Sequence, residues 1–277
     1  MNNLIEKIIW ILTINFMLNA CSSVAKDPPK PKNSLINKLD SLLTISEPEA
    51  KAIGKRIWIN ECGGTIEGLT SWNKGEYFAS LGIGHFIWYH RIKRGPYEES
   101  FPSLVRYLVS KGVNVPEFIL NKQCPWETRD DFVKARNSPQ MIELRNLLLS
   151  TIPLQTEFIL LRLENALPKM LSAISMKNRS TVQANFYKLT RTAKGKYALM
   201  DYINFKGEGT KISERYNGQG WGMLQALEEM NPNTETRNAP NEFAQAAEKV
   251  LIRRVRNAPR DESIWLKGWQ NRLKTYH

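Results

Sequence analysis

Helical patterns fill most of this chain, and one short region is the exception, which restricts the fold to a mainly α class. After Pro96, apolar side chains recur at helical spacing in a series of segments. The expected helices span 101–111, 129–137, 139–149, 156–175, 181–191, 222–230 and 242–257, and a last one begins near 261. We therefore predict a mainly α (α+β) fold, a helical domain with one small β-hairpin near its start.

The first helix of this domain has clear start and stop signals. Ser46 can cap the first turn, which also contains two acidic residues and a proline. Ile53, Ile57 and Glu61 then follow at four-residue spacing, on one face of the helix. Gly63 and its glycine neighbour can adopt the positive φ that ends helices. The pattern places Glu61 in the last helical turn.

The β region follows directly. Residues 65–72 and 76–83 flank Asn73-Lys74-Gly75, whose glycine is placed for a tight hairpin turn. Gly82 and Gly84 then allow the backbone to bend back toward the helices. The outcome is a hairpin beside the end of the first helix.

The position of Glu61 suggests acid chemistry. Apolar neighbours disfavour the charged form of a carboxyl group, and the negative end of a helix acts in the same direction, so both raise its pKa. A carboxyl group that stays protonated near neutral pH can serve as a general acid. On position alone, a salt-bridged glutamate at a helix end is the more ordinary interpretation.

The order of helix, Glu61, glycine pair, hairpin and Ser80-Leu81-Gly82-Ile83-Gly84-His85 resembles the active-site region of phage-type lysozymes, in the lysozyme-like superfamily. In those enzymes a catalytic glutamate closes the first helix, and a hairpin strand ends in Thr-x-Gly-x-Gly-His. The resemblance covers residues 46–90. It implies a lysozyme-like fold and cleavage of the β-1,4 bond between N-acetylmuramic acid and N-acetylglucosamine. It also implies that Glu61 is the general acid, that Ser80 is the hydroxyl residue, and that His85 is structural and pairs with an acid outside the chemistry.

One departure from the phage-type pattern leaves the reaction open. Those enzymes carry an aspartate before the hydroxyl residue, whereas this chain offers Glu76, and further away Glu67. We take Glu76 as the candidate second carboxylate of a muramidase, with a solvated hairpin glutamate as the alternative. A lytic transglycosylase needs only the single acid Glu61. A peptidoglycan-binding lipoprotein without activity, and a secreted protein that attacks rival bacteria or counters a host, are further alternatives.

A second cluster contains aromatic and amide side chains in a glycine-rich segment that we expect to be a loop, over residues 202–209 and 216–222. Aromatic faces and a few polar groups suit a sugar-binding pocket. We therefore predict substrate contacts from Tyr216, Gln219 and Trp221, with Glu208 as a reserve carboxylate and Trp72 as an aromatic near the hairpin. The alternative is a glycine-rich turn with a core tryptophan.

The N-terminus has the features of an export signal. An apolar run at 8–18 is too short to span a bilayer and ends at Ala20-Cys21, which resembles a bacterial lipobox. We predict a lipoprotein signal peptide at 1–20, a lipidated Cys21 with a Lys/Pro-rich tether at 21–45, and a catalytic domain at 46–277. An ordinary cleaved signal is the alternative. A lipid anchor would hold the protein at the membrane, with the periplasmic face of the outer membrane as the expected location.

Cysteine usage and charge fit this location. If Cys21 carries lipid, Cys62 and Cys124 remain as a pair that could form a disulfide in an oxidising compartment. No Cys/His spacing suggests a metal, and we expect no cofactor. The formal net charge of +12 suits a partner such as anionic peptidoglycan, while the export signal argues against nucleic acid. The sequence does not indicate an oligomeric state.

Overall fold

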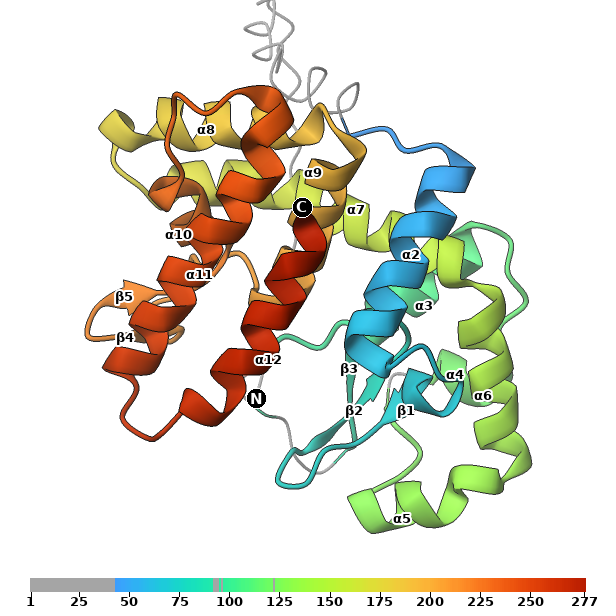
Figure 1. The fold of residues 1–277 in the computed structure, drawn as a ribbon. Helices are drawn as coiled ribbons and strands as arrows, with labels where there is room; N and C mark the ends of the chain where they lie inside the picture. Colours follow the sequence, from blue (N-terminus) through green and yellow to red (C-terminus); the bar gives the residue numbers. More distant parts are fainter. Residues whose placement is uncertain (1–42, 92–94, 96, 122) are drawn as a thin grey trace, which may run out of the picture. The chain divides into compact units, whose positions relative to one another are not determined.

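Helices dominate the structure, and small antiparallel sheets complete it, as the mainly α prediction requires (Figure 1). The structure is a computed structural model that describes residues 43–91, 95, 97–121 and 123–277. The α-helices are α2 (Glu47–Cys62), α3 (Phe101–Ser110), α4 (Glu117–Leu120), α5 (Arg129–Lys134), α6 (Pro139–Ser150), α7 (Ile152–Ser172), α8 (Met176–Thr190), α9 (Ala193–Lys206), α10 (Met223–Glu229), α11 (Ala239–Asn257) and α12 (Ser263–Leu273). Short 3₁₀ helices are η1 (Glu67–Leu69), η2 (Ala135–Asn137), η3 (Thr236–Asn238) and η4 (Lys274–Tyr276).

The caps of α2 confirm its predicted boundaries. The Ser46 side chain accepts a hydrogen bond from the backbone of Glu49, and the Glu49 side chain accepts one from the backbone of Ser46, which forms a capping box. Gly63 ends the helix with a φ of 63°. Ile53 and Ile57 are buried on the inner face. The sequence signals at both ends therefore hold in three dimensions.

The predicted hairpin is wrong in extent, because it is part of a three-stranded antiparallel sheet. The strands are β1 (Thr70–Ser71), β2 (Phe78–Leu81) and β3 (Phe86–Tyr89), and β2 lies in the centre. Ser80 pairs with Ser71 on one side and with Ile87 on the other. The segment from Gly82 to His85 is the turn between β2 and β3, not an exit toward the helices. A second small hairpin, β4 (Arg215–Tyr216) with β5 (Gln219–Gly220), replaces part of the predicted loop.

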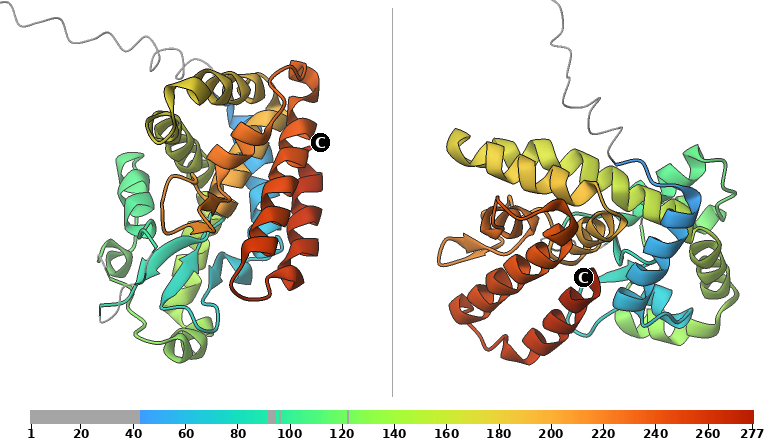
Figure 2. Two further views of the ribbon diagram at one scale, coloured as in Figure 1. Left: turned by 90° about the vertical axis from the view of Figure 1, so that its left-hand side faces the viewer. Right: turned by 45° about the horizontal axis from the view of Figure 1, so that its top comes forward.

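Helix α7 connects the two halves of the described domain. It packs against α2 and α3 from the first half and against α8 and α9 from the second (Figure 1). Helices α11 and α12 lie side by side in the second half (Figure 2). The buried core runs through both halves and includes Ile57, Trp88, Leu163 and Phe243. This arrangement brings the end of α2 and the end of α12 to the same place.

Helix α9 is absent from the predicted helices, and its last turns occupy the first part of the predicted loop. Thr192 caps it through Gly195, and Gly207 follows it with a φ of 77°. Nearly every side of its second half is buried, including Asp201, so the segment lacks the polar face that marks an amphipathic helix. Two other helices, α7 and α8, begin about one turn earlier than predicted, and α7 carries a proline in its first turn.

The folded domain begins before Ser46. Leu43 is fully buried in the core, and the carbonyl oxygen of Thr44 accepts a hydrogen bond from Lys196 at 2.7 Å. The predicted tether therefore ends earlier than residue 45. The predicted signal peptide and Cys21 lie outside the described residues. Within the described part, no helix is long and apolar enough to cross a membrane.

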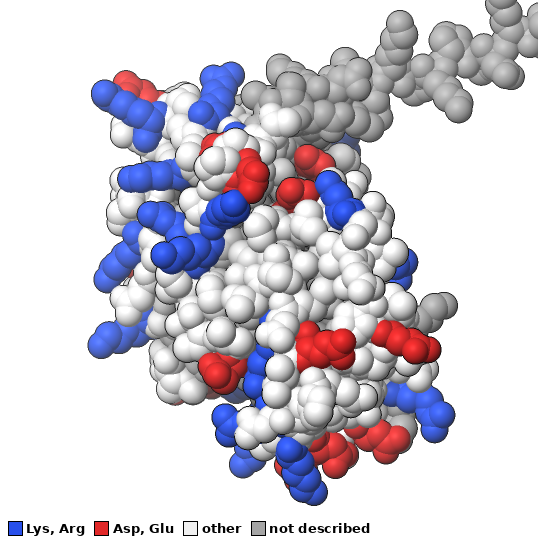
Figure 3. Space-filling view, turned by 90° about the vertical axis from the view of Figure 1, so that its right-hand side faces the viewer, with Lys and Arg blue, Asp and Glu red and all other residues white. Residues whose placement is uncertain are grey.

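The positive charge is distributed unevenly over the surface. In Figure 3 many lysines and arginines gather along the upper left edge of the face shown and others lie at its lower end, whereas most acidic side chains lie toward its centre, right and lower part. An excess of basic side chains on a surface attracts anionic polymers over distances near the Debye length, about 8 Å at physiological salt. The charge is a property of the surface and does not define a site.

Candidate functional site

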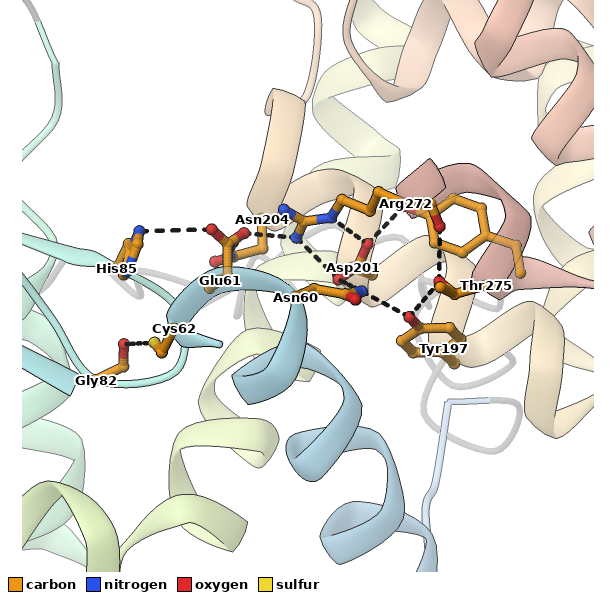
Figure 4. A network of polar contacts seen from close by, with 11 residues as sticks. Asn60, Glu61, Cys62, Gly82, His85, Tyr197, Asp201, Asn204, Arg272 and Thr275 are labelled. Carbon is orange, nitrogen blue, oxygen red and sulfur yellow. Dashed lines mark hydrogen bonds and ion pairs between the residues drawn. The ribbon is translucent and has the colours of Figure 1, made fainter. Parts of the chain in front are cut away.

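Glu61 lies at the meeting point of four elements (Figure 4). It is the penultimate residue of α2, and its side chain is 12% exposed. Oε1 accepts hydrogen bonds from Asn204 of α9 at 3.1 Å and from Arg272 of α12 at 2.5 Å. Oε2 faces Nδ1 of His85, in the β2–β3 turn, at 3.5 Å. Glu61 thus joins the first helix, the sheet and the C-terminal helices.

Arg272 links Glu61 to a second buried acid. Its guanidinium donates to Asp201 Oδ2 at 2.7 Å and to Oδ1 at 2.9 Å. Asp201 is fully buried and also accepts from Tyr276 at 2.6 Å and from Asn60 at 3.2 Å. A buried carboxylate is tolerated only when its charge is paired and its lone pairs are occupied. The chain meets both conditions for Asp201.

The same network fastens the C-terminus to α2. The hydroxyl of Tyr197 accepts a hydrogen bond from Asn60 at 2.8 Å and lies 2.6 Å from Thr275 Oγ1. Asn60 precedes Glu61 on α2, while Thr275 belongs to η4, just after α12. The last residues of the chain are therefore part of the structure that positions Glu61.

The predicted raised pKa of Glu61 is wrong for this structure. Burial on its own raises the pKa, but the Arg272 guanidinium, His85 and the Asn204 amide together outweigh burial and hold the pKa of Glu61 below its ordinary value. The position of Glu61 at the helix end is as predicted, but its ion pair with Arg272 decides the direction in which its pKa shifts. Arg272 could not be foreseen because it is 211 residues away in the sequence.

The partner of His85 also differs from the predicted one. We expected it to pair with an acid outside the chemistry, and it faces Glu61 itself. Its backbone φ is 46°, a left-handed conformation that is rare without glycine. A strained backbone conformation is kept only where the surroundings enforce it. The turn thus holds the His85 side chain toward the carboxylate.

Gln155 of α7 supports this turn from below. It is fully buried, and Oε1 accepts from the backbone nitrogen of Ile83 at 2.9 Å. Its amide donates to the carbonyl of Leu148 at 2.6 Å. Gly82 lies so close that a Cβ there would stand 2.3 Å from Oε1, and a Cβ at Gly84 would stand 2.5 Å from the ring of Phe86. Close packing explains why both positions of the Gly-Ile-Gly-His segment are glycine.

The other predicted catalytic residues lie in or near the sheet. Glu76 accepts from Asn73 Nδ2 at 3.1 Å. Burial raises the pKa of Glu76, against the lowering effects of Asn73 and His85. Ser80 is 4% exposed in the central strand β2. Their proposed roles stay predictions.

Two of the predicted sugar-binding aromatics are core residues. Trp72 is 6% exposed, packs edge-on against Phe132 and donates to the carbonyl of Glu76. Trp221 is 8% exposed and contacts both the ring of Tyr216 and the guanidinium of Arg254. Their faces are covered by protein, so the prediction of a sugar contact is corrected for both. Apolar packing, not ligand binding, fixes them.

The remaining members of the second cluster keep accessible surface. Tyr216 is half-buried and donates to Glu262 at 2.9 Å, and Gln219 is exposed in β5. Glu208 forms an ion pair with Lys169 of α7 at 3.1 Å. The reserve carboxylate therefore has a structural partner, and Tyr216 and Gln219 remain candidate substrate contacts.

The predicted disulfide is not formed. Cys62 and Cys124 are both buried free thiols. Cys62 follows Glu61, and its thiol donates to the carbonyl of Gly82 at 3.6 Å, whereas the backbone nitrogen of Cys124 donates to the carbonyl of Tyr89 at 3.0 Å. Burial raises the pKa of each thiol to about 12, which makes both unreactive at neutral pH. Among the described residues, no group of histidine, cysteine and acidic side chains could hold a metal ion.

Sequence reasoning missed Asp201, Asn204 and Arg272. Asn204 belongs to the segment that we expected to be a loop, and its helical placement would have pointed it toward Glu61. No local motif marks Arg272 or Asp201. Comparison of the chain with protein-family models, with curated proteins and with solved structures gives no match. The geometry around Glu61 is therefore the feature of this chain that bears on its function.

Proposed function

We propose that this chain is a lysozyme-like glycosidase that cuts peptidoglycan strands between N-acetylmuramic acid and N-acetylglucosamine, with Glu61 as the general acid. The observation that carries the proposal is the placement of Glu61 at the end of α2, where it faces the Gly-Ile-Gly-His turn through His85. Glycoside cleavage needs a carboxyl group beside the leaving oxygen. Glu61 is partly exposed and held on three sides, so it can present its carboxyl group in a fixed direction.

The ion pair with Arg272 sets how Glu61 gains its proton. Arg272 makes two hydrogen bonds to Asp201 and one to Glu61, so it keeps a full partner if Glu61 becomes neutral. Substrate that excludes water beside Glu61 strengthens the effect of burial, which raises its pKa. The resting site holds a carboxylate, and the occupied site holds the acid.

The fate of the sugar after bond cleavage distinguishes two reactions. In a muramidase, Glu76 would orient water or stabilise positive charge on the sugar. In a lytic transglycosylase, Glu61 acts first as acid and then as base, and no water attacks. This chain has no aspartate at the place where the phage-type enzymes carry one, and that departure supports the transglycosylase reaction as the second candidate.

A peptidoglycan-binding protein without activity is the third candidate, and the ion pair of Glu61 favours it. A carboxylate neutralised by Arg272 could be purely structural. In that case Gln at position 61, which keeps hydrogen bonds to Asn204 and Arg272, would leave the behaviour of the protein unchanged.

The test is incubation of mature protein with peptidoglycan sacculi and analysis of the released fragments by mass. We expect fragments from the native protein and from Glu143→Gln, an exposed control on α6, and none from Glu61→Gln. Reducing ends would identify a hydrolase, and anhydro ends would identify a transglycosylase. Binding without release by all three proteins would reject the enzyme.

The location follows from the predicted lipobox. We propose that Cys21 carries a lipid that holds the enzyme at the periplasmic face of the outer membrane. The prediction is that Cys21→Ala moves the protein from the membrane fraction to the soluble fraction. A Cys21→Ala protein that stays with the membrane would contradict the anchor and leave the chemistry untouched.

A further inference from the structure

Lys206, the last residue of α9, is a partly buried amine that has no carboxylate partner among the described residues. Its ammonium nitrogen lies 3.6 Å from the ring centroid of Trp269 and 3.9 Å from that of Phe205. Within residues 43–277 as far as the structure describes them, no carboxylate lies within ion-pair distance of this nitrogen. Aromatic faces attract a cation, but more weakly than a carboxylate does at such a position. Lys206 keeps part of its surface open to solvent.

The acids nearest to Lys206 are already paired with arginines. Glu61 binds Arg272, and Glu262 binds Arg254 at 2.7 Å. Burial lowers the pKa of Lys206 to about 6, with the charges of Arg254 and Arg272 acting in the same direction and those of Glu262 and Glu61 opposing them. Of Arg254, Arg272 and Lys206, only Lys206 therefore lacks a carboxylate partner in the described part of the chain. A carboxylate placed beside Lys206 would raise its low pKa and favour the charged amine, with which it would then pair.

Lys206 stands along a path that leads to Glu61. Trp265, Trp269 and Arg272 occur at spacings of four and three residues, so they share one face of α12. The helical rise places Trp269 about 4.5 Å from the level of Arg272, and Trp265 about 6 Å further along. Trp265 is 40% exposed, and its ring stacks on that of Trp269 at 6.3 Å. A polymer held at Glu61 and extending along α12 would pass Lys206 and then Trp265.

We propose that Lys206, with Trp269 and Trp265 beside it, forms a subsite that binds a carboxylate on the glycan strand next to the bond held at Glu61. This inference rests on the proposed function and names the feature of the strand that the enzyme selects. In peptidoglycan the carboxylate can be the lactyl group of a muramic acid without a peptide, or an acid group of the peptide stem. Chitin oligosaccharides have the same glycosidic linkage and no carboxylate.

The test measures binding in a Glu61→Gln background, so that turnover does not interfere. Titration calorimetry compares three ligands of equal length: stem-free peptidoglycan glycan, stem-bearing glycan and chitin oligosaccharide. We expect one or both carboxylate ligands to bind at least about tenfold more tightly than chitin, as a charged hydrogen bond allows. Lys206→Met should reduce them to the affinity of chitin without changing chitin itself. Lys134→Met, an exposed lysine on α5, is the matched control and should change nothing.

The outcomes separate the claims. A preference for stem-free glycan identifies the lactyl group as the ligand, and a preference for stem-bearing glycan alone identifies the stem. Equal binding of all three ligands, or an equal loss of all three in Lys206→Met, would overturn the subsite and leave the proposed function standing. No binding of any glycan would overturn the proposed function as well. Lys206→Arg keeps the cation, should retain the preference, and serves if Lys206→Met does not fold.

Discussion

Replacement of Arg272 by methionine is the perturbation that best tests the network around Glu61. Arg272 is 9% exposed and donates to two acids, and Asp201 is 0% exposed. Methionine retains much of the apolar volume and the contact with Phe205 but leaves both carboxylates without a cation. The effect is therefore electrostatic to a first approximation.

The magnitude follows from the burial of Asp201. Removing one partner of a buried ion pair costs about 3–5 kcal/mol of unfolding free energy, because the remaining charge stays buried and unpaired. Tyr276 and Asn60 still donate to Asp201, which favours the lower end of that range. Neutralising Asp201 as well removes the unpaired charge. We expect Arg272→Met with Asp201→Asn to be more stable than the sum of the single variants by about 1–3 kcal/mol.

The assay is urea unfolding followed by circular dichroism, with the slope of the transition compared between variants. Arg237→Met is the matched control, because Arg237 is 80% exposed and pairs with an exposed Glu235, so it should cost less than about 1 kcal/mol. A loss below about 1 kcal/mol for Arg272→Met would refute the account. Additive single and double variants would show that Arg272 and Asp201 do not act as a pair.

Four further outcomes follow. Arg272→Met should raise the pKa of Glu61 above its ordinary value, because burial remains when the guanidinium is gone. Carbon-13 NMR titration of the Glu61 carboxyl measures this pKa, and a fall or no change would contradict the prediction. In the native protein the pKa of Glu61 lies below its unfolded value, so the stability that Glu61 contributes is present above a pH of about 4.3 and is lost as the pH falls below it. Urea unfolding at pH 5 and pH 3 should therefore show a smaller loss of stability for Glu61→Gln than for the native protein. The pKa of Lys206 lies at about 6, below the unfolded value, so the folded protein holds a neutral amine where the unfolded chain is still protonated. Native stability should therefore rise between pH 6.5 and 8.5 by up to about 1.4 kcal/mol per pH unit more than that of Lys206→Met, and equal rises would contradict the lowered pKa. Gln155→Leu leaves the buried Ile83 nitrogen without an acceptor and should lower the free energy of unfolding by about 3 kcal/mol. Ser46→Ala, which removes one helix cap, should lower it by about 1 kcal/mol. Equal losses in the two variants would contradict the role of Gln155 as the support of the turn.

Local signals in the sequence predict local structure well in this chain. The start of α2 at Glu47 and its end at Gly63 depend on neighbouring residues, and both were predictable from capping chemistry. The three-stranded sheet was predicted only as a hairpin, because no turn was recognised in front of β3. The Gly82–His85 turn fixes the pairing of β3 with β2. From the sequence, this segment was interpreted as a bend toward the helices, whereas it connects two strands.

The site itself depends on contacts that no local pattern contains. Arg272 contacts Glu61 although the two residues are 211 positions apart in the sequence. The packing of α12 determines that Arg272, and not another of the many basic residues, is the partner of Glu61. Helix α9 escaped prediction because burial on nearly all sides removes the helical periodicity that reveals surface helices. The sign of the Glu61 pKa shift was wrong for the same reason, because burial was visible in the sequence and its counter-charge was not.

The most direct test of Glu61 as the general acid uses two substrates that differ in their need for a proton. Glu61→Gln should slow the cleavage of peptidoglycan sacculi by about 10²–10⁴-fold, the contribution of a positioned acid. The same variant should retain activity on a muramic-acid glycoside with a dinitrophenolate leaving group, which departs without protonation. Cleavage of sacculi by Glu61→Gln at the native rate would contradict the account.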